Sequence, residues 1–282
     1  MKKIKSFISE FAKIYLNNRL SVSAAGLSYY LTMTLFPIVI CIYTMLGNNY
    51  ERAMDVLDLL ARVFPEKTLS IAEDFLEYVS ENYSVLMMFL ALSVILITSS
   101  AAFRLIDGTI GQMQGGRRYE GYGFFVFSIV LSLAFLAIIY LGIAAIFFSE
   151  NLIMYVNVHL PQINLDQSWV YLKYPVLFAV FFLVIVLIFE VCKRREDNYK
   201  TYPGALISTV GLEIVSVFFS LIISKSVKYQ VVYGWLGSVI VLMFWLYSCT
   251  LVIFCGAAAN VAIRNIREKN QPEDKLGEVT TD

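Results

Sequence analysis

Six long apolar segments, separated by shorter polar ones, dominate the pattern of this chain. Each is about 20 residues long, which is the length that a helix needs to cross a hydrocarbon core about 30 Å thick. Because that core offers no water to backbone groups, each segment is expected to form a helix. The pattern therefore predicts an all-α, polytopic six-helix transmembrane bundle, with spans at about 25–47, 84–106, 124–148, 170–190, 204–224 and 236–259.

Three segments outside the spans have patterns of their own. Residues 1–20 carry apolar residues at steps of three and four together with lysines. This predicts an amphipathic helix that lies in the membrane surface or docks on the end of the bundle. The loop 48–83 has two apolar helical repeats on either side of Pro65, which predicts two short interfacial helices. Residues 263–282 form a polar tail, of which we expect 268–282 to be frayed or disordered.

Lysine and arginine are divided unequally between the two sides of this arrangement. Sixteen of the 22 lie on the side of the transmembrane domain (residues 21–262) that holds both termini. Basic residues concentrate in the cytoplasmic loops of membrane proteins. We therefore predict a multi-pass protein of the cytoplasmic membrane with its N- and C-termini in the cytoplasm.

Composition narrows the classes of function. Hydrophobic residues make up 59% of the chain and charged residues 16%, against about 25% charged in a soluble domain. The apolar segments use most of the 282 residues, so we expect no soluble catalytic domain and no enzyme. A net charge of zero gives no sign of a nucleic-acid partner. Four cysteines without a CxxC pair, and His159 as the one histidine, predict buried thiols, no metal site and no cofactor.

The glycine-rich stretch 107–123 is predicted as a loop on the side of the termini, because glycines allow tight turns. A phosphate-cradling loop would need a strand before it, a helix after it, and a following lysine and hydroxyl residue. The stretch lacks these features, so we expect no nucleotide site there.

The fifth span carries the most specific polar pattern. Glu213 lies about 13–14 Å into this span at 1.5 Å per residue, close to the midplane. Thr209, Ser216 and Ser220 share its face of the helix, because the steps are three or four residues. Ionisable residues at this depth usually face the bundle interior or a water-filled cavity. The row predicts either a polar substrate pathway or a structural carboxyl group that is hydrogen-bonded across helices.

Other candidates lie in the first, second and last spans. Arg104 and Ser100 share one face of the second span, and Arg104 would pair with Asp107, reach outward to phosphates or meet a carboxylate of another span. In the first span, the adjacent Tyr29 and Tyr30 are polar residues that a plain anchor does not need, and Pro37 removes a backbone hydrogen bond. Asn260 is expected to cap the end of the last span or to bond to the first.

Two groups of motifs carry a resemblance to a known family. The first group is Ser23-Ala24-Ala25, Tyr29-Tyr30 and Leu35-Phe36-Pro37. The second is Tyr233-Gly234-x-Leu236-Gly237, Trp245-Leu246-Tyr247 and Gly256-Ala257-x-x-Asn260, with Pro203-Gly204-Ala205 at the mouth of the fifth span. In this combination the chain resembles the YihY/BrkB family of bacterial inner-membrane proteins over roughly residues 15–262.

The resemblance implies six helices with both ends inside the bacterial cell. Some members once carried the label ribonuclease BN, but this sequence contains no nuclease constellation and no basic RNA groove. Envelope and lipid-export roles have been proposed for relatives. The family often has a Glu where this chain has Ala258, and Glu213 is a candidate to take over its task.

We therefore expect a transport-class protein that binds or moves a lipid-like or amphiphilic substrate through a polar groove in the bundle. The alternative is a non-transporting scaffold or envelope assembly factor whose acidic loop 48–83 meets a partner. Membrane lipids are the expected partners, and the sequence does not predict an oligomeric state. A cavity that reaches Glu213 would favour transport, whereas a tightly packed and paired Glu213 would favour the scaffold.

Overall fold

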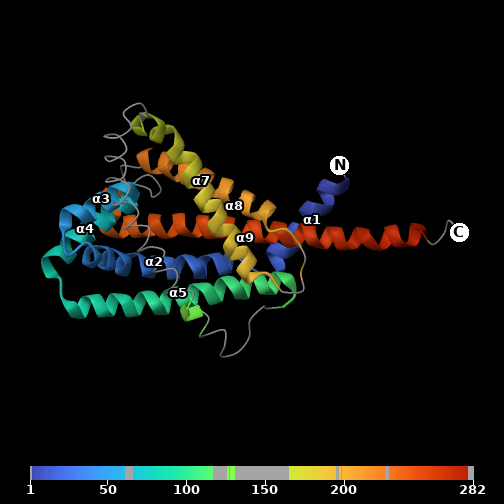
Figure 1. Cartoon of the computed structure of the whole chain (residues 1–282), viewed down its shortest axis with the longest axis horizontal. Helices are drawn as coiled ribbons and strands as arrows, with labels where there is room; N and C mark the ends of the chain where they lie inside the picture. The colour runs from blue at the N-terminus through green and yellow to red at the C-terminus, as the bar shows by residue number, and fades with distance from the viewer. Residues whose placement is uncertain are drawn as a thin grey trace.

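The computed structural model describes residues 2–60, 66–116, 126, 128–130, 165–194, 197, 199–225 and 229–278. Within these ranges every regular element is an α-helix, in agreement with the predicted all-α class. The helices are α1 (Lys2–Asn17), α2 (Leu20–Met45), α3 (Tyr50–Leu60), α4 (Glu66–Asn82), α5 (Val85–Gln114), α7 (Leu165–Cys192), α8 (Tyr202–Lys225) and α9 (Tyr229–Glu278) (Figure 1).

Four helices in the described part of the chain are long and apolar enough to cross a membrane. They correspond to four of the predicted spans and cover Leu20–Met45, Val85–Gln114, Tyr202–Phe219 and Val239–Lys269. Phe178–Cys192 in α7 is a shorter apolar helix that overlaps the predicted span 170–190. The predicted span 124–148 lies outside the described residues, apart from 126 and 128–130. The count of six spans therefore stays a prediction.

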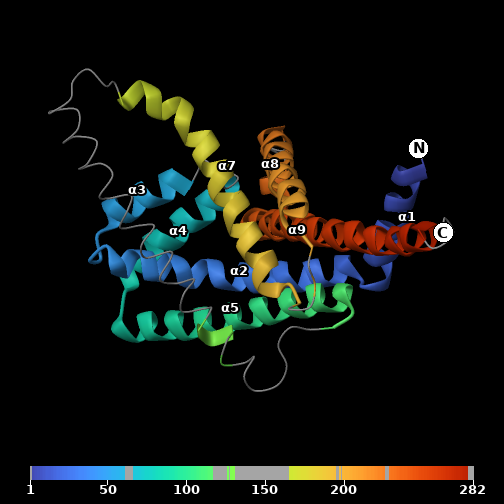
Figure 2. The ribbon, with the colours of Figure 1, turned by 45° about the vertical axis from the view of Figure 1, so that its right-hand side comes forward.

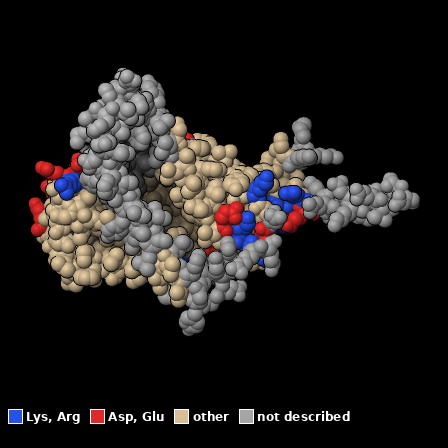
Figure 3. Space-filling model, viewed as in Figure 1, with Lys and Arg blue, Asp and Glu red and all other residues tan. Residues whose placement is uncertain are grey.

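Helices α2, α5 and α9 lie side by side along the length of the bundle, and α7 crosses them obliquely (Figures 1 and 2). Helix α1 and the last part of α9 lie at one end, which we call the terminal end (Figure 1). The α3–α4 pair lies at the other end. On the face shown in Figure 3, charged side chains gather at the two ends, and a band of uncharged residues separates them. This distribution is what a membrane-spanning bundle requires.

The apolar core is divided along the bundle. At the terminal end, α1, α2, α5, α7 and α9 share a cluster that includes Leu20, Ile110 and Phe254. At the opposite end, the second half of α2 packs against α3, α4 and the start of α5 around Leu76 and Ile95. The predicted pair of short helices in 48–83 is confirmed, since α3 and α4 end and begin on either side of the Pro65 region.

Helix α5 is longer than the sequence pattern predicted. The stretch 107–123 was expected to be a loop, but α5 continues through Gly108 to Gln114 and ends at Gly115, whose φ of 83° is left-handed. Ile106, Ile110 and Met113 are buried at helical spacing in this extension. Their packing stabilises a helix that the glycines alone would weaken.

Helix α9 is also longer than predicted. It has 50 residues and continues to Glu278, where a fraying tail was expected. Extending a helix that is already formed avoids the cost of nucleation, so polar residues can continue a helix that the apolar span has started.

Helices α8 and α9 run antiparallel and touch along most of the length of α8. At the start of α8, the main chain of Gly204 lies directly against that of Gly256, with Ser208 beside it. At the other end, Phe219 packs on Leu242 and Trp245. Small residues such as Gly204, Ser208 and Gly256 allow helix backbones to approach closely inside membranes.

We predict that Gly204→Ala lowers the stability of the bundle. Its added Cβ would overlap the main-chain oxygen of Gly256 and force α8 away from α9. Overpacking of this kind costs about 1–3 kcal/mol, and thermal unfolding of the purified protein in detergent measures the loss. Gly116→Ala is the matched control, because its Cβ would first meet the flexible end of Arg194, at 3.6 Å. Equal midpoints for the wild type and Gly204→Ala would contradict the close packing.

Candidate functional site

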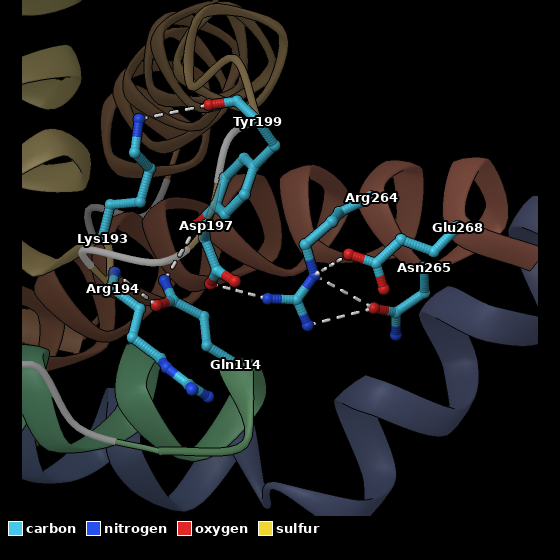
Figure 4. A network of polar contacts seen from close by, with 8 residues as sticks. All are labelled: Gln114, Lys193, Arg194, Asp197, Tyr199, Arg264, Asn265 and Glu268. Atoms are coloured by element: carbon cyan, nitrogen blue, oxygen red, sulfur yellow. Dashed lines mark hydrogen bonds and ion pairs between the residues drawn. The ribbon is translucent and has the colours of Figure 1, made fainter. Parts of the chain in front are cut away.

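The terminal end of the bundle holds a continuous polar network. It is built by the end of α5, residues 193, 194, 197 and 199–201 between α7 and α8, the stretch 260–269 of α9, and α1 (Figure 4). These segments are distant in sequence, and the apolar cluster beneath them brings them together. We treat this network as the candidate site because its polar groups are largely withdrawn from solvent.

Asn260 ties the start of α8 to α9. Its side chain is 3% exposed; the Gly204 N–H donates to its Oδ1 (2.7 Å), and its Nδ2 donates to the Thr201 carbonyl (2.9 Å). Gly204 is in the first turn of α8, where backbone N–H groups have no partner within the helix. A Thr just before a helix often caps it with its own hydroxyl, but here the Thr201 hydroxyl donates to Glu190 (2.7 Å). Asn260 therefore supplies the cap from another helix, and neither of the expected Asn260 roles is the one found.

Gln114, at the end of α5, joins the segment that follows α7. Its Nε2 donates to the Tyr199 hydroxyl oxygen (2.8 Å), and the Arg194 backbone N–H donates to its Oε1 (2.9 Å). Burial, and next the charge of Asp197, raise the pKa of Tyr199, so its phenol stays protonated. The contacts fix where α5 ends relative to α7.

An ion pair links the same segment to α9. Arg264 Nη1 donates to Asp197 Oδ2 at 2.7 Å, and both side chains are 14% exposed. Two further Arg264 nitrogens donate to Asn265 Oδ1 (3.1 and 3.3 Å). A charged hydrogen bond in such a sheltered position is stronger than an exposed pair. Lys193 pairs with Glu190 at 2.9 Å nearby, which continues the network toward Thr201.

Glu10 fastens α1 to α9. Asn265 Nδ2 donates to Glu10 Oε1 (3.0 Å), and Lys269 Nζ donates to Glu10 Oε2 (3.1 Å). The bonds from Asn265 and Lys269 lower the pKa of Glu10 below its ordinary value of 4.5. Of the two positions expected for the amphipathic helix, the docked one is therefore present.

The network was not predicted as a site. Its Lys and Arg residues entered the sequence analysis only as charges that set topology, Asp197 was not considered, and Gln114 was assigned to a loop. A sequence signal for it does exist, because polar and charged residues precede the first apolar segment and follow the second, fourth and sixth, all on the same predicted side. That signal indicates a shared end of the bundle but does not identify which side chains meet.

The predicted Glu213 row is not buried as a unit. Thr209 is 1% exposed and its hydroxyl donates to the Ala205 carbonyl (2.9 Å), whereas Glu213 is exposed and Ser216 is half-buried. Glu213 is therefore not packed inside the bundle, and the alternative that it faces a water-filled cavity stays a prediction. Helices α7 and α8 diverge from the short segment that joins them (Figure 2), so α7 covers only the beginning of α8. The side chain of Ser220 and all of His159 lie outside the described residues.

The remaining candidates form two separate pairs, on α5 and on α2, and do not form one site. Arg104 Nη1 donates to the Ser100 hydroxyl (2.6 Å) within α5, and Ser100 is buried. Tyr29 is 49% exposed on α2 and contacts Tyr30, which packs against the terminal cluster. Helix α2 continues through Pro37 to Met45.

Hydroxyl groups inside the spans also join helices. The Thr34 and Thr98 hydroxyls are hydrogen-bonded at 2.9 Å between α2 and α5. Thr250 of α9 donates to the Ala24 carbonyl of α2 at 3.0 Å. Cys41, Cys192 and Cys249 are buried, as predicted, and Cys255 is partly buried. No group of three or more His, Cys, Asp or Glu residues that could hold a metal ion occurs in the described part of the chain.

These features define an α-helical membrane protein with several spans. The chain belongs to the virulence factor BrkB family, whose sequence model matches residues 11–278. This confirms the resemblance that the motifs in the first and last spans indicated. Ala258, at the position where that resemblance leads us to expect a Glu, is fully buried in the terminal cluster.

Relatives are similar over most of this chain. The "Putative ribonuclease-like protein YfkH" of Bacillus subtilis is 23% identical over 95% of this chain and 98% of its own length. The "UPF0761 membrane protein IL2447" of Idiomarina loihiensis is 23% identical over 95% and 94%. The "UPF0761 membrane protein Smlt0865" of Stenotrophomonas maltophilia is 27% identical over 90% of this chain and 59% of its own length. No solved structure matches the chain. Our expectation that the chain is not an enzyme stays a prediction.

We predict that Asn260→Leu destabilises the junction of α8 and α9. The change keeps a similar volume but leaves the buried Gly204 N–H without its acceptor, at a cost of about 1–3 kcal/mol. The thermal midpoint of the purified protein should fall. Ser248→Ala is the matched control on α9, because it removes a local bond to the Phe244 carbonyl (2.9 Å). A midpoint that falls equally in both variants would contradict the role of Asn260 as a cap.

A second prediction concerns pH. The lowered pKa of Glu10 means that its bonds stabilise the docked α1 fully above pH 4.5 and lose this effect as the pH falls through the lower pKa of the folded protein. The difference in thermal midpoint between the wild type and Glu10→Gln should therefore be largest near neutral pH and shrink on acidification. Glu268→Gln, at a 65% exposed carboxylate nearby, should show a smaller difference throughout. A Glu10→Gln effect that stays constant across this pH range would contradict the assignment.

Proposed function

We propose that the protein is a transport-class membrane protein that binds or moves a lipid-like or amphiphilic molecule along the outward face of α8. One observation supports this proposal: the carboxylate of Glu213 is exposed at the twelfth of the 24 residues of α8. Val210, Ile214 and Val217 around it are 41%, 64% and 61% exposed. A surface with one ionisable group among apolar side chains suits a molecule with a polar head and an apolar chain.

The cost of this arrangement favours a functional role for Glu213. Placing a charged carboxylate at the centre of a membrane helix costs at least about 2.5 kcal/mol, and such residues by default mark substrate or ion pathways. A cationic or hydroxyl-bearing head group, or water that accompanies it, would offset that cost. A carboxylate buried inside the bundle could have a purely structural role, through hydrogen bonds to other helices. Glu213 is exposed, so this structural role does not explain its presence.

Arg104 is the second residue to which this proposal assigns a contact with the substrate. Its guanidinium is held by the buried Ser100, ten residues before the last residue of α5. A guanidinium is suited to an anionic head group, and its long side chain can extend toward the membrane boundary. Arg104 would then meet an anionic head group at α5, separately from the contact of Glu213 at α8.

The second candidate function is a non-transporting scaffold. It is favoured by the hydrogen bonds between spans, which satisfy Thr34, Thr98, Thr250 and Asn260 within the protein. In a scaffold these groups only hold the helices together. Glu213 distinguishes the two functions, because a scaffold requires no exposed carboxylate on α8.

Native mass spectrometry of protein released from mild detergent tests the proposal. We expect the wild type to retain a lipid of one class that Glu213→Gln loses. Glu77→Gln is the matched control, since it removes an exposed carboxylate from α4. Bare protein in all three samples, or the same lipid on all three, would overturn the role of Glu213 and favour the scaffold. Flux of the retained lipid's fluorescent derivative into vesicles that carry the protein then distinguishes movement from binding.

A further inference from the structure

We propose that α1 binds the anionic phospholipid surface of the membrane with the half of its apolar face that does not pack on the bundle. This inference does not depend on the proposed function of α8. It concerns a helix that is docked on the protein by one side and, through a second side, contacts lipid.

The apolar face of α1 is wider than its contact with the bundle. Phe7, Phe11 and Tyr15 pack against the terminal cluster, and Ile14 belongs to it with 6% exposure. Further apolar residues of α1 are exposed beside this contact, and Ile4 and Ile8 share one side of the helix because they are four residues apart. The large exposed residues are Ile4, Ile8 and Leu16, with exposures of 66%, 59% and 71%.

The charged residues of α1 are also divided between the side that contacts the bundle and the exposed side. Glu10 is the one acidic residue of this helix, and its carboxylate is turned to α9, where Asn265 and Lys269 bind it. The side chains of Lys5 and Lys13 are exposed. The outward part of α1 is therefore apolar and basic, the combination by which amphipathic helices bind anionic membranes.

The position of α1 in the chain places its exposed apolar residues at a membrane boundary. Leu16 precedes the first residue of α2 by four positions, and α2 is long and apolar enough to span a membrane. Arg19, with a left-handed φ of 49°, makes the turn between the two helices and is itself exposed. In the first turn of α2, Val22 is 65% exposed. The exposed apolar residues of α1 thus end where the outer surface of a span begins, which favours lipid over a protein partner as their occupant.

Fluorescence of the full-length protein in phospholipid vesicles tests the assignment. An environment-sensitive probe is attached at Ile8→Cys or, as the matched control, at Ser6→Cys, which is exposed on the polar side of α1. Cys255, the native thiol that is not fully buried, is replaced by alanine in both. In vesicles that contain anionic phospholipid, the probe at residue 8 should shift to the blue, resist quenching by aqueous iodide and be quenched by brominated lipid. The probe at residue 6 should remain open to iodide.

Lys5→Gln with Lys13→Gln tests the charge component. This double change should reduce the blue shift in anionic vesicles and leave it unaltered in zwitterionic ones. Iodide quenching that is equal at residues 6 and 8 would overturn the proposal. So would protection of residue 8 from both iodide and brominated lipid, because a second copy of the chain or another protein would then cover the exposed apolar residues. Equal protection in anionic and zwitterionic vesicles would overturn the requirement for anionic lipid.

Discussion

The direct approach of two main chains, at Gly204 in α8 and Gly256 in α9, determines how the terminal end of the bundle is assembled. Because no side chain separates the helices, Asn260 can reach the first turn of α8 and cap it. Thr201 is then released from capping and bonds to Glu190 of α7. The segment between α7 and α8 is thereby held where it meets α5 and α9. A side chain at either glycine would separate the helices and disrupt each of these later contacts.

The polar residues of the spans fall into two classes. The first class is satisfied inside the protein: Thr34 bonds to Thr98, Thr250 to the main chain of α2, and Asn260 to the start of α8. Such bonds supply adhesion between helices in a medium where apolar surfaces alone give little driving force. Glu213 belongs to the second class, because it lies on the outside of α8 among apolar side chains. Residues of the first class hold the helices of the bundle together, whereas Glu213 in the second class is exposed to other molecules.

The apolar and polar patterns of the sequence differ in which features of the structure they predict. Apolar length located the spans in α2, α5, α8 and α9, and apolar periodicity located the helices of the 48–83 loop, because both report burial directly. Helical spacing placed Thr209 and Glu213 on one face, yet it carries no information about which neighbouring helix covers that face. The glycines of 107–123 favoured a loop, but the buried residues around Ile110 outweigh them. The network around Gln114 and Arg264 joins distant parts of the chain, so no local pattern could identify its pairs.

The uninterrupted course of α9 has a mechanical consequence. Its 50 residues correspond to a rod of about 75 Å at 1.5 Å per residue, and about 27 Å of this lies beyond Asn260. The rod packs along α2 and α8 within the bundle, and α1 contacts it as far as Lys269. A tilt of the whole rod by about 10° at Asn260 would displace its far tip by about 5 Å for an arm of about 27 Å. A rearrangement among the spans would thus be transmitted along α9 to a point well outside the bundle.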